Sequence, residues 1–205
     1  LQMGTTIDIK NGGKIISHGP LKFEGRKNNP IIFSSSDKKG QGILVLAEGE
    51  RSDLNNVDFN NLSNPSHGSG SVTGAVTFYE SPVDLWNVSV TCNRCEDALN
   101  IVRTNFKIIN CNISQKQSEA IDGYFVTGLI KGCKFENLGN DAIDVSGSDL
   151  TITEVFIDHA GDKGLSAGED SRMTVSNVEI HNSEIAVAGK DLSTVNINGM
   201  KIEST

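Results

Sequence analysis

Aromatic residues and long apolar runs are scarce in this 205-residue sequence. Phe, Trp and Tyr together make up 5% of the residues, whereas glycine occurs 21 times. This balance favours many short strands joined by tight turns over a bundle of helices. No stretch of about 18 apolar residues occurs, so the sequence predicts no membrane-spanning helix. The length is sufficient for one domain with a sizeable core.

Positive charge is also in short supply. The 18 Lys and Arg residues are outnumbered by 26 Asp and Glu residues, which gives a net charge of −8. Contacts to phosphate groups need clustered basic side chains, so the sequence disfavours unaided binding to nucleic acid or to an anionic membrane. No signal peptide is recognisable, and the first residue is Leu1 rather than Met. We therefore expect a targeting signal or an upstream domain outside this sequence.

Cysteine is too sparse to predict a zinc finger. Cys92 and Cys95 form a lone CxxC motif with no second pair at zinc-finger spacing. As a metal or redox site this is a weak signal. The alternative is a pair of turn cysteines joined by a disulfide bond.

An internal repeat of about 22 residues begins at Gly74 and continues to the last residue. Each repeat holds three short apolar stretches separated by Gly, Asn, Asp or Ser. The alternation within each stretch is typical of strands, and helical spacing is not sustained. Aligning the repeats gives one small-residue column and four apolar columns. The small column is Ala75, Ala98, Ala120, Ala142, Gly164 and Ala186; the apolar columns are Val76, Leu99, Ile121, Ile143, Leu165 and Val187; Leu85, Ile108, Ile130, Ile152, Val175 and Ile197; Val88, Cys111, Cys133, Val155, Val178 and Met200; and Val90, Ile113, Phe135, Ile157, Ile180 and Ile202.

A coil of three short strands cannot bury its inward face alone, but stacked coils build a continuous core. The signature of leucine-rich repeats, the competing solenoid, is absent. We therefore predict an all-β fold, a right-handed single-stranded parallel β-helix of roughly eight coils, forming one domain over residues 1–205. Cys111 and Cys133 are expected to stack inside it as small buried hydrophobic side chains.

The same rhythm continues upstream less regularly. Leu21 and Phe23, then Ile43 and Val45, are expected to extend the first apolar column. Similarly, Ile31 and Phe33, then Val57 and Phe59, are expected to extend the last apolar column. The polar segment Leu62–Val72 interrupts the period and predicts an inserted surface loop that edges a binding face. The last coil shows no capping segment, so we expect adjoining domains or subunits to cover the ends of the solenoid.

An acidic stripe follows the first strand of successive repeats. Alternation predicts that Asp122 and Asp144 point outward from adjacent coils. The position before each alanine is also charged in four repeats, and the alanines themselves are expected to point outward as a flat floor. These flanking residues are Asp97, Glu119, Asp141 and Lys163. A floor with acidic walls suits an extended chain ligand.

Stacked carboxylates suggest two kinds of chemistry. Like charges about 5 Å apart raise the pKa of one carboxyl group, and a separation of about 5–5.5 Å matches retaining glycosidases. Alternatively, the oxygen cluster of Asp122, Asp141 and Asp144 suits Ca²⁺. The structural alternative is that such residues only form turns and solubilise the surface. Glu119 and Asp141 fit that alternative, whereas the mid-strand position of Asp122 and Asp144 does not.

Further candidates surround the stripe. Lys163 lies one coil beyond Asp141 and is expected to neutralise it. Tyr124, two residues after Asp122, is the best-placed sugar contact, because aromatic rings stack on sugars. The remaining candidates are Asn100, Arg103 for an anionic ligand, Glu169, the outward-pointing Trp86, Tyr79, the pair His159 and His181 one repeat apart, and His67 on the inserted loop.

Several runs resemble bacterial right-handed β-helix proteins of the pectin-lyase-like superfamily. They are PLKFEGRKNNPIIFSS, EDALNIV, EAIDGYF, GNDAIDVSGS and GDKGLSAGE. More narrowly, they resemble the repeat domains that accompany spore-coat-protein-H-like kinases. The resemblance implies the β-helix fold and, through the wider superfamily, polysaccharide lyases, glycoside hydrolases and epimerases that act outside the cell. GNDAIDV is similar to an acidic motif of polygalacturonases and makes Asp141 and Asp144 candidates, but the His-Gly and Arg-Ile-Lys elements of those enzymes are missing.

Three hypotheses follow from the sequence. The first is a secreted or cell-surface β-helix that recognises a polysaccharide along the acidic face. The second is a calcium-assisted lyase or an acid-catalysed hydrolase centred on Asp122, Asp141, Asp144 and Lys163. The third is a structural spacer or adhesin segment without catalysis.

Overall fold

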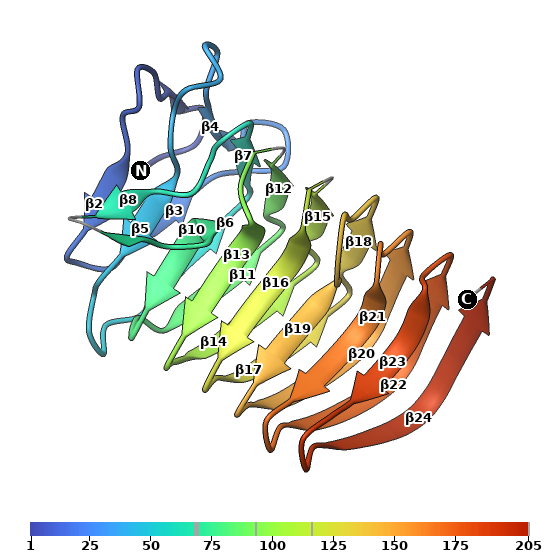
Figure 1. Ribbon diagram of the computed structural model, residues 1–205. Helices are drawn as coiled ribbons and strands as arrows, with labels where there is room; N and C mark the ends of the chain where they lie inside the picture. Colours follow the sequence, from blue (N-terminus) through green and yellow to red (C-terminus); the bar gives the residue numbers. More distant parts are fainter. Residues whose placement is uncertain (68–69, 93, 116, 205) are drawn as a thin grey trace.

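A computed structural model describes residues 1–67, 70–92, 94–115 and 117–204. The chain winds as a right-handed parallel β-helix of about eight turns, with about 23 residues in each turn (Figure 1). This confirms the predicted fold. Within the described ranges, no helix is long and apolar enough to cross a membrane.

One face of the solenoid is an eight-stranded parallel sheet, which we call the front sheet. It is built from one strand per coil, because each strand pairs with its equivalents in the coils before and after it. Its strands, in spatial order, are β2 (Ile15–Ser17), β5 (Ile43–Val45), β10 (Gly74–Tyr79), β13 (Asp97–Val102), β16 (Glu119–Tyr124), β19 (Ile143–Ser146), β21 (Lys163–Gly168) and β23 (Ile185–Gly189).

The other two faces merge into one fourteen-stranded sheet, because three long strands run through both of them. The long strands are β20 (Asp149–Asp158), β22 (Arg172–His181) and β24 (Thr194–Glu203). The second face consists of β3 (Lys22–Glu24), β6 (Ser52–Asn55), β11 (Val83–Trp86), β14 (Asn105–Ile109) and β17 (Thr127–Lys131). The third consists of β1 (Thr6–Asp8), β4 (Ile31–Ser34), β7 (Val57–Asn60), β12 (Ser89–Cys92), β15 (Asn112–Gln115) and β18 (Lys134–Glu136).

The core consists of the apolar columns predicted from the repeat. Residues one repeat apart stand opposite each other, as Val76, Leu99 and Ile121 do in the front sheet. The column from Leu85 and the column from Val90 are in register in the same way. The stacked side chains thereby bury one continuous apolar interior, which is the main favourable contribution to folding.

Upstream of Gly74 the predicted columns are partly wrong. Ile43 and Val45 do pair with Val76 and Phe78. Phe23, however, pairs with Leu54 on the second face rather than continuing the front sheet. The reason is that turns in these coils differ in length, so a fixed period cannot be extended through them. Phe33 does continue the last column, and its ring stacks on that of Phe59 with centroids 5.2 Å apart.

The cysteines fall into two groups. Cys111 and Cys133 are free and buried on adjacent coils, as predicted, and the Cys111 N–H donates to Cys133 Sγ at 3.4 Å. Cys95 is disulfide-bonded, and the side chain of Cys92 lies outside the described residues. A disulfide at Cys95 agrees with the turn-cysteine alternative rather than with a zinc site.

The corner between the second and third faces adopts a left-handed backbone conformation in seven successive coils, beginning between β6 and β7. Asn and Gly adopt positive φ at low cost, which explains the recurrence of these residues between the apolar stretches. Six of the seven corner residues are Asn or Gly, and the exception is Glu154, with a φ of 55°. The corner residues are Asn56, Asn87, Asn110, Gly132, Glu154, Asn177 and Gly199.

We expect Glu154→Asn to raise the free energy of unfolding by about 0.5–1 kcal/mol, because Asn tolerates the left-handed region better than Glu. The ion pair that Glu154 makes with Lys131, at 3.3 Å, is exposed and contributes little. Chemical denaturation of both proteins measures the difference. Glu154→Gln removes the charge but keeps the long side chain, so an equal gain in that control would contradict the backbone explanation.

Candidate functional site

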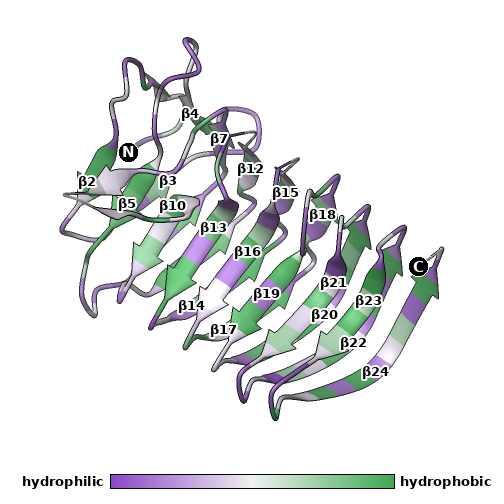
Figure 2. Cartoon of the chain, in the orientation of Figure 1, coloured by the Kyte–Doolittle hydropathy of each residue, from purple (hydrophilic) through white to green (hydrophobic). Residues whose placement is uncertain are grey.

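Hydrophilic residues stand at the start and in the middle of β13 and β16 in the front sheet, next to hydrophobic positions (Figure 2). The outward positions of this sheet follow from a break in alternation. Ala98 and Leu99 are consecutive, yet both belong to the apolar core, and the pairing register skips the alanine. Asp97 and Asn100, on either side of them, are therefore brought to the same outward face.

The predicted floor of outward alanines is wrong. Ala75, Ala98, Ala120 and Ala142 have no exposed surface and pack in the core. A methyl group is small enough to turn inward where the chain enters the strand, so a strict two-residue period does not hold there. As a result, two columns that flank the alanines both face outward and lie close together. One holds Asp97 and Glu119, and the other holds Asn100 and Asp122.

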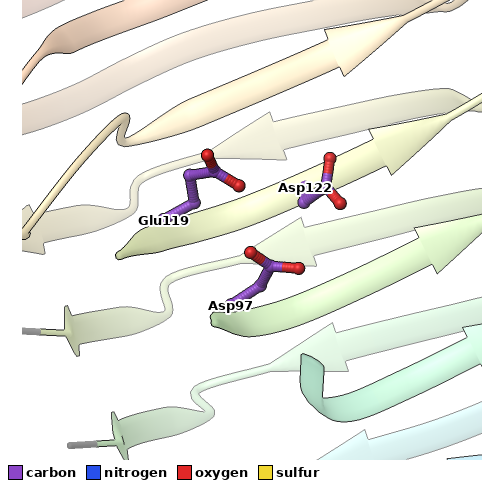
Figure 3. Close-up of side chains that lie close together, drawn as sticks. All are labelled: Asp97, Glu119 and Asp122. Carbon is purple, nitrogen blue, oxygen red and sulfur yellow. The ribbon is translucent and has the colours of Figure 1, made fainter. Parts of the chain in front are cut away.

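Three carboxylates converge on this face, and we call Asp97, Glu119 and Asp122 the acidic cluster. One carboxylate oxygen from each lies within 4.8 Å of the other two. Figure 3 shows the three side chains on the same side of β13 and β16. Asp97 is 1% exposed and Asp122 is 6% exposed, so the negative charges are recessed into the face rather than solvated.

The members of the cluster differ in their hydrogen bonds. Asn100 Nδ2 donates to Asp122 Oδ2 at 2.9 Å, and Asn140 Nδ2 donates to Glu119 Oε1 at 2.7 Å. Both carboxylate oxygens of Asp97 are buried without a hydrogen-bond partner among the described residues, although Thr73 and Glu119 lie close enough to affect its pKa. A buried carboxylate left in this state is costly unless a proton or a cation neutralises it.

Burial and mutual repulsion shift the proton equilibria of all three groups. Burial, reinforced by the charge of Asp122, raises the pKa of Asp97 to about 7. Burial and the neighbouring Asp97 raise the pKa of Glu119 to about 8. Burial and the charges of Glu119 and Asp144 raise the pKa of Asp122 to about 7. The cluster therefore retains protons near neutral pH and can exchange them for a cation or pass them to a bound molecule.

The predicted calcium ligands Asp122, Asp141 and Asp144 have different surroundings. Asp144 stands opposite Asp122 in the register, and its charge raises the pKa of Asp122. Asp141 accepts a hydrogen bond from the Lys163 N–H at 2.9 Å, and Lys163 Nζ lies 3.5 Å from the same oxygen. Lys163 thus forms an ion pair with Asp141 and also pairs with Asp162.

Sequence reasoning did not select Asp97 as a ligand, although Asp97 lies opposite Glu119 in the register of the repeat. A second residue it did not select is Ser166, which stands opposite Asp144. The Ser166 hydroxyl is fully buried and has no hydrogen-bond partner within the described part of the chain. The front sheet therefore also holds a buried neutral polar group beside its carboxylates.

Tyr124 is placed as predicted, beside Asp122 and 42% exposed. The negative charge of Asp122 is the main cause that raises the pKa of Tyr124 to about 12. Tyr79 lies in the same outward column two coils away. Val102, in the coil between them, stands opposite Tyr79 on one side and Tyr124 on the other. This column supplies aromatic rings along one edge of the acidic face.

Other predicted ligand residues lie away from the acidic cluster. Arg103 Nη1 lies 3.7 Å from Glu80 Oε1 and donates to the Tyr79 hydroxyl at 3.3 Å, beyond the end of β13. Glu169 follows β21, and its carbonyl accepts a hydrogen bond from Gly147. Trp86 is 40% exposed on the second face. These residues are not brought together with the carboxylates.

The two histidines one repeat apart are neighbours, because the His159 N–H donates to the His181 carbonyl at 3.1 Å. Their side chains nevertheless pair with different carboxylates. His159 Nδ1 lies 2.9 Å from Asp158, and His181 lies 3.5 Å from Glu179 and 3.6 Å from Glu203. The side chain of His67 lies outside the described residues.

The sequence of residues 97–205 matches the family model "Right handed beta helix region". This match covers more than half of the chain, and the chain belongs to that family. No curated protein matches the sequence.

Three solved structures illustrate the likeness in fold. A rhamnogalacturonan lyase is 12% identical with a TM-score of 0.44, and the match covers 99% of this chain and 66% of that one. An alginate lyase from Paenibacillus sp. str. FPU-7 is 10% identical with a TM-score of 0.35, covering 98% and 91%. A mannuronic acid specific family 6 lyase from human gut microbiota is 12% identical with a TM-score of 0.20, covering 98% and 77%. At such values these structures carry no argument about what this chain binds.

Proposed function

We propose that this β-helix recognises a uronate polysaccharide laid across the front sheet and bridged to the protein by a calcium ion at the acidic cluster. One observation carries the proposal. The carboxylate of Asp97 is buried without a hydrogen-bond partner in the described structure, beside two further carboxylates. Calcium binds six to eight oxygen ligands, and Asp97, Glu119 and Asp122 would supply several of them.

The cation explains how an acidic face can bind an acidic chain. Without it, the carboxylates of the front sheet would repel a uronate polymer. With it, coordination positions left open by the protein are available to sugar carboxylates and water. Tyr124, exposed beside the cluster, offers a ring for stacking against a sugar. The pectin-lyase-like resemblance of the sequence supports the same class of ligand.

Catalysis is a second candidate function of the same site. Carboxyl groups whose pKa values lie at about 7 and about 8 are suited to general acid and base catalysis near neutral pH. A lyase would generate unsaturated sugar ends, and a hydrolase would generate new reducing ends without unsaturation. Incubating the protein with polygalacturonate and alginate and assaying both kinds of end distinguishes these activities from binding alone.

A polysaccharide ligand implies a secreted or cell-surface location. The disulfide bond of Cys95 supports this part of the proposal, because disulfides persist in oxidising compartments.

Calorimetric titration of calcium into metal-free protein at pH 8 tests the cation site. We expect micromolar binding that Asp122→Asn weakens at least tenfold, since a ligand oxygen and a charge are lost. Asp149→Asn makes the same chemical change at an exposed position of β20, outside the front sheet, and is expected to bind like the wild type. A wild-type protein that binds no calcium would overturn the proposal.

The glycan is tested with the calcium-loaded protein. Polygalacturonate and alginate are titrated in turn, and binding is expected to disappear when a chelator removes the cation. Tyr124→Ala is expected to weaken the polymer about tenfold, because stacking against the ring is lost, while calcium affinity stays the same. Equal glycan binding with and without the chelator would contradict the bridging role of the cation.

A further inference from the structure

An inserted hairpin lies beside the acidic face. Between β7 and β10 the chain leaves the coil and forms β8 (Ser66–His67) and β9 (Gly70–Ser71), the antiparallel pair among the named strands. Two side chains fasten it to the neighbouring coils. The Ser66 N–H donates to Gln41 Oε1 at 3.0 Å, and Lys14 Nζ donates to Ser66 Oγ at 2.8 Å. Figure 1 shows the hairpin in front of β5.

The hairpin covers the N-terminal end of the same outward face that carries the cluster. Leu44 stands opposite Thr77, which stands opposite Asn100, so Leu44 belongs to the outward column that leads to Asp122. Leu44 is only 3% exposed. It lines a cavity of about 270 Å³ between the sheet and the hairpin, whose walls are Leu44, Leu46, Tyr79, Gly70, Ser71 and Val72.

The face remains open in the opposite direction. Beyond Asp122 the outward column continues with Asp144 and Ala188, which are half-buried, and with Ser166 between them, whose short side chain is buried. In Figure 1 no described segment lies in front of β19, β21 or β23. A chain lying across the strands can therefore extend towards β23 but meets the hairpin at β10.

We propose that the face is a groove closed at one end, which binds the terminus of a polysaccharide chain rather than its interior. This inference rests on the proposed function. The terminal sugar would stack the apolar face of its ring on Tyr79 at the opening of this largely apolar cavity, with its carboxylate in solvent and the chain running over the acidic cluster. Tyr79 and Tyr124 are two coils apart, roughly 10 Å at the usual strand spacing. An extended sugar residue is about as long as one such spacing, so the third sugar from the end would reach Tyr124.

Stoichiometry separates binding to chain ends from binding to chain interiors. The calcium-loaded protein is titrated with two size fractions of the polymer that binds, polygalacturonate or alginate, at equal mass concentration. Halving the mean chain length doubles the number of ends per gram, so we expect twice as many binding sites per gram. An equal number of sites per gram in both fractions would overturn the inference and leave the proposed function standing.

Replacing residues 63–72 with a short turn tests the hairpin itself. Opening the closed end is expected to make the number of sites per gram independent of chain length. Thermal unfolding shows whether this variant folds, and the wild-type stoichiometry decides the question if it does not. A folded variant whose number of binding sites per gram still doubles when the chain length is halved would contradict the role of the hairpin. Absence of binding to both polymers would overturn the proposed function, and this inference with it.

Discussion

Asp97→Asn is expected to stabilise the metal-free protein at pH 8, although it removes a side chain from the proposed site. Burial raises the pKa of Asp97 from 3.8 to about 7 in the folded state. The folded protein therefore binds more protons than the unfolded chain between about pH 4 and pH 7. Stability is fully present below this window and is lost as the pH rises through it. Asparagine cannot ionise, so the variant avoids that loss.

The size of the effect follows from the shift. One pKa unit corresponds to about 1.4 kcal/mol, so a shift of about three units sets an upper limit of about 4 kcal/mol. We expect a gain of about 2–4 kcal/mol at pH 8 and little difference at pH 4.5. Denaturant unfolding of wild type and variant, both with a chelator, measures it at the two pH values.

The control for this prediction is again Asp149→Asn on β20. Asp149 is exposed, so its substitution is expected to change the free energy of unfolding by less than about 0.5 kcal/mol at either pH. An Asp97→Asn protein that is less stable than wild type at pH 8 would show that the carboxylate is ionised and well solvated in the fold. The proposed need for a cation would then lose its physical basis.

The repeat predicted most of the fold because residues that share an apolar column in the aligned repeats also stack on one another in the structure. A β-helix places equivalent residues opposite each other in adjacent coils, so Leu85 and Ile108 are aligned both in sequence and in space. The prediction failed for Phe23, where coils of unequal length shift the register. Turn length is set by local loop sequence, which carries no periodic signal.

The candidate site was predicted only in part, and for a different reason. Asp122 was found because a carboxylate in mid-strand is unusual. Asp97 was placed in the acidic walls together with Glu119 but was not selected as a ligand. Strict alternation does not show how close that column lies to Asp122, because the distance depends on Ala98 turning inward beside Leu99. Side-chain size decides that local step. A sequence pattern of two-residue period therefore cannot show that three carboxylates converge.

Calcium binding is expected to release protons, and calcium affinity is therefore expected to depend steeply on pH. The acidic cluster holds protons near neutrality because burial raises the pKa of Glu119 to about 8 and those of Asp97 and Asp122 to about 7. A metal ion must displace these protons. For each displaced proton, the apparent calcium affinity rises about tenfold per pH unit while the pH is below the pKa of the group that loses the proton. We expect a gain of about 10- to 100-fold between pH 6 and pH 7, and a plateau above pH 8.

Calorimetry in two buffers with different ionisation enthalpies counts the released protons directly. At pH 6.5 the wild type is expected to release about one proton or more per calcium ion, and Asp97→Asn fewer, because one of the proton-holding carboxyl groups is gone. Asp149→Asn is expected to match the wild type. An affinity that is independent of pH, without proton release, would mean that the carboxylates are already ionised before the metal arrives. Proton release that Asp97→Asn reduces would instead identify the cation as the group that neutralises the buried carboxylates of the front sheet.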